Sequence, residues 1–369
     1  HESLMEHALK SARKSIVLLE NNAFNGKKLL PLADNIKNIG LIGPLADNRE
    51  SMLGTWHASG DEPKVVTVKE GIEKEFPNAN IEYAKGCDFE GDDKSNFAEA
   101  VNLAKKSELV IMAVGENWQQ NGEAASRSNI GLPGVQNELV QEIRKTGKPV
   151  IVLLMAGRPL AVPWISENIP AVLNTWHLGT RAGDAIADVL SGEYNPSGKL
   201  TITFPRNEGQ IPVYYSHKNT GRPLEPDNKY TTKYLDVPNE PLYPFGYGLS
   251  YTSFEYSDIV LNKEKINFRD TLTATVTVEN TGDFPGEEIV QLYVRDMVGS
   301  VTRPVKELKG FRKFSLNPRD SKVVKFNISA KDLRFYNNNM NFVAEPGDFK
   351  IFIGSSSVDC KEASFKLVK

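Results

Sequence analysis

Residues 1–205 alternate between short, continuously apolar runs and stretches with helical spacing. The apolar runs lie at residues 36–43, 109–114, 150–157 and 170–176, and the helical stretches at residues 67–76, 98–106, 135–145 and 182–190. Strands without polar positions are buried on both faces, and strands that alternate with helices form a mostly parallel sheet with helices on both sides. Right-handed crossovers then predict a doubly wound α/β sandwich.

The pattern changes after Phe204. Residues 206–243 are rich in Pro, Asn, Gly and Tyr with little periodicity, which is typical of an extended linker. From residue 254 the apolar positions alternate with period two. About seven short runs over roughly a hundred residues, without a Cys…Trp…Cys core, predict a fibronectin type III-like sandwich. We therefore expect an α/β domain at 1–205, a linker at 206–243 and an all-β domain at 244–369.

Two details of these elements can be checked against a structure. Thr67 stands directly before an amphipathic stretch and is the predicted N-cap of a helix. In the all-β part, the aromatic residues Tyr293, Phe311, Phe314 and Phe326 are expected in the core rather than on a sugar-binding surface.

Composition narrows the class of protein. The chain has 369 residues, 40% of them hydrophobic and 25% charged, as in an ordinary globular protein with two domains. A net charge of −3 without a basic block argues against nucleic acid as a partner. No apolar stretch approaches the ~20 residues of a membrane span. Cys87 and Cys360 are expected to be lone thiols, and no metal-binding spacing or nucleotide-binding motif occurs, so we expect no metal and no cofactor.

The apolar residues at the start of the chain have helical spacing, but no helix start signal precedes them. Leu4, Ala8, Ala12 and Ile16 recur at helical intervals, and neither an N-cap nor a Met start precedes them. We therefore expect the chain to be the C-terminal part of a longer protein.

Ligands of doubly wound sheets bind outside the carboxyl ends of the strands. The loops expected there place six side chains along one edge: Trp56, Glu116, Glu123, Arg127, Arg158 and His177.

The loop at 115–132 carries the main candidate chemistry. Two carboxyl groups that flank a glycosidic bond can act as acid and as nucleophile or base, so Glu116 and Glu123 are one candidate pair. Alternatively, Glu116 binds backbone amides or Arg127 and holds the loop. Small residues beside Glu123, such as Gly122, permit close approach of a substrate.

The other candidates have two interpretations each. Trp56 either stacks on a sugar ring or fills a gap beneath its loop. Arg158 is expected to tie down neighbouring loops, and His57 and His177 to form loop hydrogen bonds rather than to catalyse.

Longer strings then resemble one known family. NGEAASRSNIGLPGVQ is similar to the S-G-E-A-x-S-R…L-P-G-x-Q signature of glycoside hydrolase family 3. SARKSIVLLEN, NIGLIGPLADN, GEYNPSGKLTITFPR, YYSHKNTGRP and PLYPFGYGLSYTSFEYS are also close to strings of that family. The resemblance covers essentially the whole chain and is strongest to periplasmic β-glucosidases.

The resemblance implies a three-part protein with an N-terminal (β/α)₈ barrel, an α/β sandwich and a fibronectin type III-like domain, of which this chain matches the last two. The family's nucleophile is a barrel aspartate, typically in an S-D-W string that is absent here. Its acid/base glutamate matches Glu123, although Asn121 replaces the usual serine. Trp56 matches a tryptophan beyond the cleaved bond, and Arg127 is expected to contact substrate with it. Glu116 and Arg158 are expected to support the loop.

The implied protein is a retaining, exo-acting β-glucosidase in the periplasm or secreted. Its partners would be a β-glucoside or β-linked oligosaccharide and its own barrel, and this chain alone is expected to be inactive. The alternatives are a β-xylosidase, a broad exo-β-glucanase, or a non-catalytic carbohydrate-binding or structural module.

Overall fold

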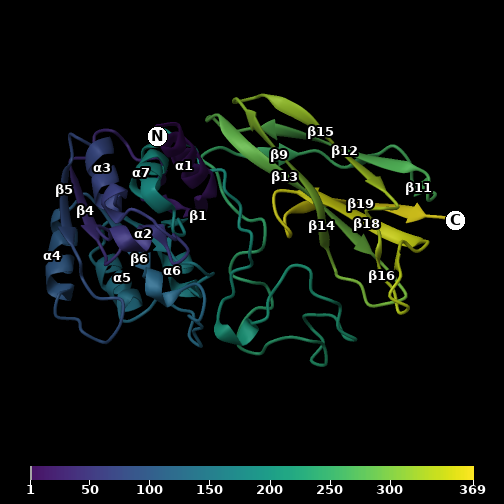
Figure 1. Ribbon diagram of the computed structural model, residues 1–369, viewed down its shortest axis with the longest axis horizontal. Helices are drawn as coiled ribbons and strands as arrows, with labels where there is room; N and C mark the ends of the chain where they lie inside the picture. Colours follow the sequence, from purple (N-terminus) through teal and green to yellow (C-terminus); the bar gives the residue numbers. More distant parts are fainter. Residues whose placement is uncertain (1) are drawn as a thin grey trace. The chain divides into compact units, whose positions relative to one another are not determined.

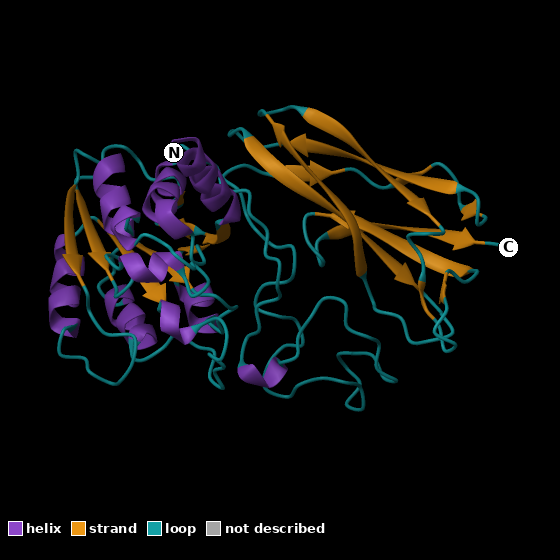
Figure 2. Ribbon diagram, in the orientation of Figure 1, coloured by secondary structure: helices purple, strands orange, loops and turns teal. Residues whose placement is uncertain are grey.

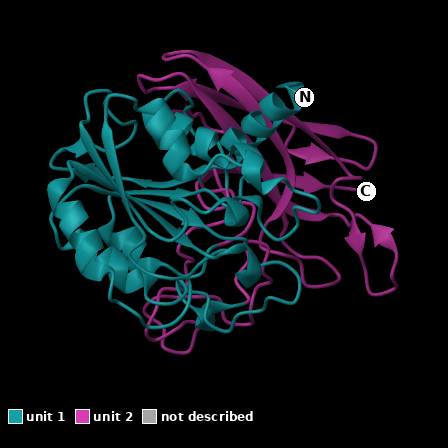
Figure 3. Ribbon diagram, turned by 60° about the vertical axis from the view of Figure 1, so that its left-hand side comes forward, with its two compact units in different colours: residues 1–199, 204–211, 248–251 teal, residues 200–203, 212–247, 252–369 magenta. Residues whose placement is uncertain are grey.

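A computed structural model describes residues 2–369. The chain divides into two compact units, coloured separately in Figure 3. Unit 1 comprises residues 1–199, 204–211 and 248–251, and unit 2 comprises residues 200–203, 212–247 and 252–369. The segment expected as a linker is thus shared between the units. Its regular structure is a single turn of 3₁₀ helix, η4 (Glu208–Gln210).

Unit 1 is an α/β sandwich around a six-stranded sheet in the order β1-β8-β7-β6-β4-β5 (Figure 1). Strand β1 runs antiparallel to β8, and the remaining pairs are parallel. The strands of unit 1 are β1 (Val17–Asn21), β2 (Ala23–Phe24), β3 (Lys27–Lys28), β4 (Asn38–Ile42), β5 (Asn80–Ala84), β6 (Leu109–Gly115), β7 (Val150–Met155) and β8 (Ala171–Asn174). Strands β2 and β3 form a separate two-stranded ribbon.

Helices cover both faces of this sheet, as the continuously apolar strands require. The α-helices are α1 (Glu2–Ser15), α2 (Arg49–Leu53), α3 (Val68–Glu75), α4 (Phe97–Lys106), α5 (Gln136–Arg144), α6 (Pro163–Asn168) and α7 (Ala182–Ser191). The short 3₁₀ helices are η1 (Glu62–Lys64), η2 (Trp118–Gln120) and η3 (Gly179–Arg181). Helices α1, α3 and α7 pack together, and α4 packs beside α5. The predicted cap is confirmed, because Thr67 and Glu70 form a capping box at the start of α3.

Strand β6 shows how the sequence builds this core. All seven of its residues are buried. Ile111 and Ala113 belong to the cluster formed with residues of α3 and α7, such as Ile72 and Ile186. Because successive side chains of a strand point to opposite faces, the residues between them face the other layer of helices. This explains why the strand has no polar position.

Unit 2 contains a β-sandwich, drawn as orange arrows in Figure 2. One sheet has the order β10-β12-β15, with β9 also paired to β12, and the other has the order β11-β19-β18-β13-β14. The strands are β9 (Phe254–Tyr256), β10 (Val260–Leu261), β11 (Lys265–Ile266), β12 (Thr271–Asn280), β13 (Gly286–Asp296), β14 (Glu307–Leu316), β15 (Ser321–Ser329), β16 (Phe335–Tyr336), β17 (Phe342–Val343), β18 (Gly347–Gly354) and β19 (Cys360–Leu367). The predicted fold classes of both parts are therefore confirmed.

One prediction about the core of unit 2 was wrong. Tyr293 and Phe326 are buried and Phe314 packs against the core, but the Phe311 side chain is 59% exposed. Phe311 lies on β14, at the edge of its sheet, and faces away from the partner sheet.

Cys87 and Cys360 are unpaired thiols, as expected. Among the described residues, no helix is long and apolar enough to cross a membrane.

Candidate active site

A long loop leaves the sheet at Gly115 and joins β6 to α5. Gly115 has a φ of +146°, and a Cβ atom there would lie 1.8 Å from the Met155 carbonyl oxygen, so glycine is required. The buried Gln136 fixes this point from the far end of the loop. Its Nε2 donates to the Gly115 oxygen and its Oε1 accepts from the Gly115 nitrogen, both at 2.8 Å. The two ends of the loop are therefore held together.

Beneath the loop lies a buried carboxylate. The Glu116 side chain is fully buried and forms ion pairs with two arginines. Arg127 Nη1 lies 2.7 Å from Oε1, and Arg158 Nε lies 2.9 Å from Oε1 and 3.2 Å from Oε2. Both oxygens of Glu116 are thus engaged, which argues against its acting as a catalytic partner of Glu123.

The same arginines hold the loop backbone on both sides of Glu123. Arg158 Nη2 donates to the carbonyl oxygens of Gln120 and Ala125, at 2.6 and 2.7 Å. Arg127 Nη2 donates to the Gly131 carbonyl oxygen at 3.0 Å. The buried Glu116 carboxylate therefore orients the guanidinium groups of Arg127 and Arg158, and their hydrogen bonds hold the loop backbone in place.

A second set of contacts joins this loop to those after β4 and β8. The Thr55 hydroxyl is bonded to the carbonyl oxygens of Trp118 and Asn121, the latter at 2.7 Å. Asn121 Nδ2 donates to the Asn117 oxygen at 2.8 Å and lies 3.0 Å from His177 Nε2. Asn121, which occupies the position of a serine in the family signature, therefore bridges two loops.

The protonation state of His177 follows from its partners. Its Nδ1 lies 2.6 Å from the Ser51 carbonyl oxygen, which can only accept, so Nδ1 carries the proton. Nε2 then accepts from Asn121, and the ring is neutral. Burial lowers the pKa of His177 below its ordinary value of 6.5, against the opposing effects of the Ser51 hydrogen bond and the Glu116 charge.

Glu123 differs from Glu116 in both its exposure and its contacts. Its side chain is exposed, and among the described residues it has no hydrogen bond and no ion pair. Its neighbours Gly122 and Ala124 have φ values of +89° and +58°, so the backbone turns sharply at Glu123. A Cβ atom on Gly122 would lie 2.7 Å from Thr55 Cγ2. A free carboxyl on a fixed backbone suits a group that exchanges protons with a bound molecule.

The two aromatic residues near the loop are not equivalent. The Trp56 side chain is 73% exposed and therefore does not fill a gap beneath its loop. Trp118 is half-buried in η2, and its ring lies edge-on to that of His57 with centroids 6.5 Å apart. Trp56 follows Thr55, which contacts Gly122, and so its backbone lies beside the Glu123 turn. The exposed ring is available for stacking on a flat ligand.

The six side chains expected at one edge of the sheet thus belong to loops that contact one another. Glu116, Arg127 and Arg158 form one cluster, and His177 joins a second through Asn121. The roles of Thr55, Asn121 and Gln136 were not recognised from sequence. The final glutamine of the L-P-G-x-Q string was the one available signal. In the described part of the chain, no group of three His, Cys, Asp or Glu side chains could hold a metal ion.

Comparisons with known proteins identify the family of both parts of the chain. Residues 16–251 match the glycosyl hydrolase family 3 C-terminal domain, and residues 288–357 match a fibronectin type III-like domain. A periplasmic beta-glucosidase of Salmonella typhimurium is 44% identical over 98% of this chain and 50% of its own length. A beta-xylosidase of Formosa agariphila is 44% identical over 95% of this chain and 48% of its own length.

Solved structures give the same result. A β-glucosidase of Listeria innocua in complex with isofagomine superimposes with a TM-score of 0.93 at 39% identity, covering 100% of this chain and 50% of the other. The chain spans about half the length of the curated relatives that it matches.

Proposed function

Because the chain belongs to glycoside hydrolase family 3, we propose that it supplies the acid/base of a retaining, exo-acting β-glucosidase, with Glu123 in that role. One observation carries the assignment. Of the two glutamates in the loop after β6, Glu116 is buried between arginines, whereas Glu123 is exposed and unpartnered among the described residues. Only Glu123 is free to exchange a proton with substrate.

In the proposed mechanism, the nucleophile is an aspartate on a barrel domain of the same protein. It attacks the anomeric carbon while protonated Glu123 donates its proton to the leaving oxygen. The Glu123 carboxylate then takes a proton from the water that attacks the glycosyl-enzyme. Two displacements retain the configuration, and they require carboxyl groups about 5–5.5 Å apart. The chain alone is therefore proposed to be inactive.

The other loop residues have supporting roles in this proposal. Glu116 and Arg158 position the loop backbone, because Arg158 pairs with Glu116 and donates to the carbonyl oxygens of Gln120 and Ala125, one on each side of Glu123. Trp56 provides an exposed ring face for the leaving group. Arg127 contacts substrate through the part of its guanidinium group that Glu116 and Gly131 leave free, since its side chain is 19% exposed.

A β-xylosidase is the second candidate. It is favoured by the beta-xylosidase of Formosa agariphila, which is as similar to this chain as the periplasmic beta-glucosidase of Salmonella typhimurium, at 44% identity. The name of the latter also supports a periplasmic location for the whole protein. Glu123 would have the same role in either enzyme.

Hydrolysis of aryl β-glucosides and aryl β-xylosides tests both proposals. The chain would be assayed alone and joined to a family 3 barrel domain. The proposal predicts no turnover by the chain alone, turnover by the joined protein, and a higher kcat/KM for the glucoside. Turnover by the chain alone would exclude a nucleophile outside it, and a preference for the xyloside would establish the second candidate.

A further inference from the structure

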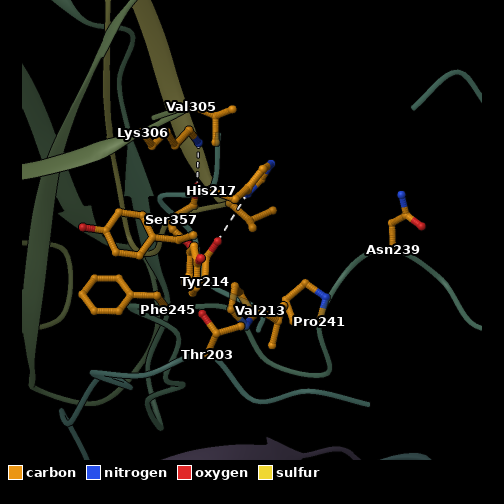
Figure 4. A pocket seen from close by; sticks show the side chains of 13 residues that line it. Thr203, Val213, Tyr214, His217, Asn239, Pro241, Phe245, Val305, Lys306 and Ser357 are labelled. Atoms are coloured by element: carbon orange, nitrogen blue, oxygen red, sulfur yellow. Dashed lines mark hydrogen bonds between the residues drawn. The ribbon is translucent and has the colours of Figure 1, made fainter. Parts of the chain in front are cut away.

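Unit 2 contains a cavity that the proposed reaction does not use. Its volume is about 310 Å³, which is at the lower end of the range for small-molecule sites. Its walls come from five segments of unit 2: residue 203, residues 213–217, residues 239–245, residues 305–306 and residues 357–358. Figure 4 shows side chains of these segments around one space.

The walls are held in place by contacts within unit 2. The Tyr215 ring stacks on Phe245 with centroids 4.4 Å apart, and its hydroxyl accepts from the Leu308 nitrogen at 3.2 Å. The Val305 nitrogen donates to the His217 oxygen at 2.9 Å. The cavity is therefore a formed site rather than a gap between mobile loops.

Most of the lining is flat and apolar. Tyr215, Phe245 and Pro244 supply ring surfaces, and Val213 and Val305 supply aliphatic ones. Such walls suit a ligand that presents carbon-bound hydrogens on one face.

Two hydroxyl groups give a ligand in this cavity polar partners. Thr203 and Ser357 are 6% and 5% exposed, and both line the cavity. Among the described residues, neither Oγ1 of Thr203 nor Oγ of Ser357 has a hydrogen-bond partner. Neither oxygen belongs to the buried side-chain atoms without a partner, so both hydroxyls are open to the cavity and can donate to and accept from a ligand.

The charged and titratable groups that line the cavity indicate the charge of its ligand. Lys306 Nζ donates to the Ser357 carbonyl oxygen at 2.6 Å and lies 4.3 Å from the centre of the Phe352 ring, so its charge is already balanced in part. His217 uses Nδ1 toward the Tyr214 oxygen at 3.3 Å, which leaves Nε2 for a ligand. No carboxylate lines the cavity, so nothing in it favours a cation.

We propose that this cavity is a non-catalytic binding site for a single neutral hexopyranose unit of an oligosaccharide. The apolar face of the sugar ring packs on the aromatic wall, and its hydroxyl groups bond to Thr203, Ser357 and His217. Tyr214, whose side chain is 54% exposed, covers the ring at the rim. Glu123 does not line the cavity, so this proposal is independent of the catalytic role proposed for Glu123.

Ligand-detected saturation-transfer NMR on this chain tests the proposal, with cellobiose and laminaribiose as probes. Saturable transfer to one sugar ring is expected. Tyr214→Ala should weaken binding roughly threefold to tenfold, the usual value of one aromatic contact. Thr203→Val keeps the side-chain shape and should also weaken binding. Tyr230→Ala is the matched control, because Tyr230 is 72% exposed and does not line the cavity.

The outcomes are distinguishable from those of the catalytic proposal. Glu123→Gln should bind both disaccharides as the unmodified chain does. Absence of saturation transfer, or binding that Tyr214→Ala and Thr203→Val both leave unchanged while thermal unfolding shows intact folding, would overturn the site. Binding of phenol without binding of either disaccharide would also overturn it, because the cavity would then accept an apolar ring rather than a sugar.

Discussion

Two glutamates seven positions apart in one loop have opposite environments. Glu116 directly follows a buried strand, so its side chain lies inside the protein, where a carboxylate is stable only if it is paired. Glu123 lies at a sharp turn between Gly122 and Ala124, where its side chain faces solvent. Removing the charge from each residue should therefore have different consequences.

Glu116→Gln should lower the free energy of unfolding of this chain by about 2–4 kcal/mol. The substitution keeps the shape of the side chain but leaves Arg127 and Arg158 without a counter-charge. Urea denaturation measures the change. Glu123→Gln, the same substitution in the same loop, is the control and should change stability by no more than about 0.5 kcal/mol. Equal effects of the two substitutions would refute the supporting role of Glu116.

His177 should make the stability of the chain depend on pH. Because burial lowers its pKa in the folded state, the unfolded chain takes up the proton first as the pH falls through about 6.5. Stability is then lost below that pH, with a slope of at most about 1.4 kcal/mol per pH unit from this residue. The melting temperature of the unmodified chain should fall more steeply from pH 7.5 to pH 5 than that of His177→Gln. Parallel curves would show that His177 is not the responsible group.

Among the single residues, Glu123 became the acid/base candidate only through its match to the family signature. Spacing alone favoured a structural role for Glu116 and left catalysis by Glu123 open, because the burial of either residue depends on where the chain leaves the sheet. The bridge from Asn121 to His177 joins positions 56 residues apart, and no local pattern marks it. Gln136 was visible as part of a string, but its bonds to Gly115 were not.

Helices α3 and α7 approach each other closely at two glycines. A Cβ atom on Gly71 would lie 2.1 Å from the Gly183 carbonyl oxygen, and one on Gly183 would lie 1.9 Å from that of Thr67. The two helices approach so closely because neither has a side chain at these positions. This packing covers one face of the sheet that carries the Glu123 loop.

Gly71→Ala should therefore destabilise the chain, even though alanine favours helices. The added methyl group separates α3 from α7, and we expect a loss of about 1–3 kcal/mol. Chemical denaturation of Glu73→Ala provides the comparison, since Glu73 is exposed on the same helix and should tolerate the change within about 0.5 kcal/mol. A neutral Gly71→Ala would mean that the helices can move apart without cost.

The elements themselves were largely predictable. Continuous apolar runs such as residues 109–114 and 150–157 became buried parallel strands, because both faces of the sheet are covered. The antiparallel pairing of β1 with β8 was not predicted, since a buried edge strand has the same composition in either direction. Phe311 was misassigned because the period of a strand does not show which of its faces is covered.

At the scale of the whole molecule, the chain contains only one of the two carboxyl groups of the proposed catalytic site. The loop that carries Glu123 is built within unit 1 from its own residues, whereas the proposed retaining mechanism needs a second carboxylate, which we propose lies on a barrel domain. This chain covers about half the length of the relatives that it matches. In this proposal, Glu123 transfers the proton in both steps of the reaction.

The proposed role of Glu123 can be tested by chemical rescue of Glu123→Ala in the chain joined to a family 3 barrel domain. Without the acid/base, an aryl glucoside with a poor leaving group should lose activity by about 10²–10⁴-fold, the usual contribution of such a group. A substrate with a good leaving group should still form the glycosyl-enzyme, and azide should then restore turnover and give a β-glycosyl azide. Full activity of Glu123→Ala on the poor leaving group, or the absence of any azide product, would contradict the account.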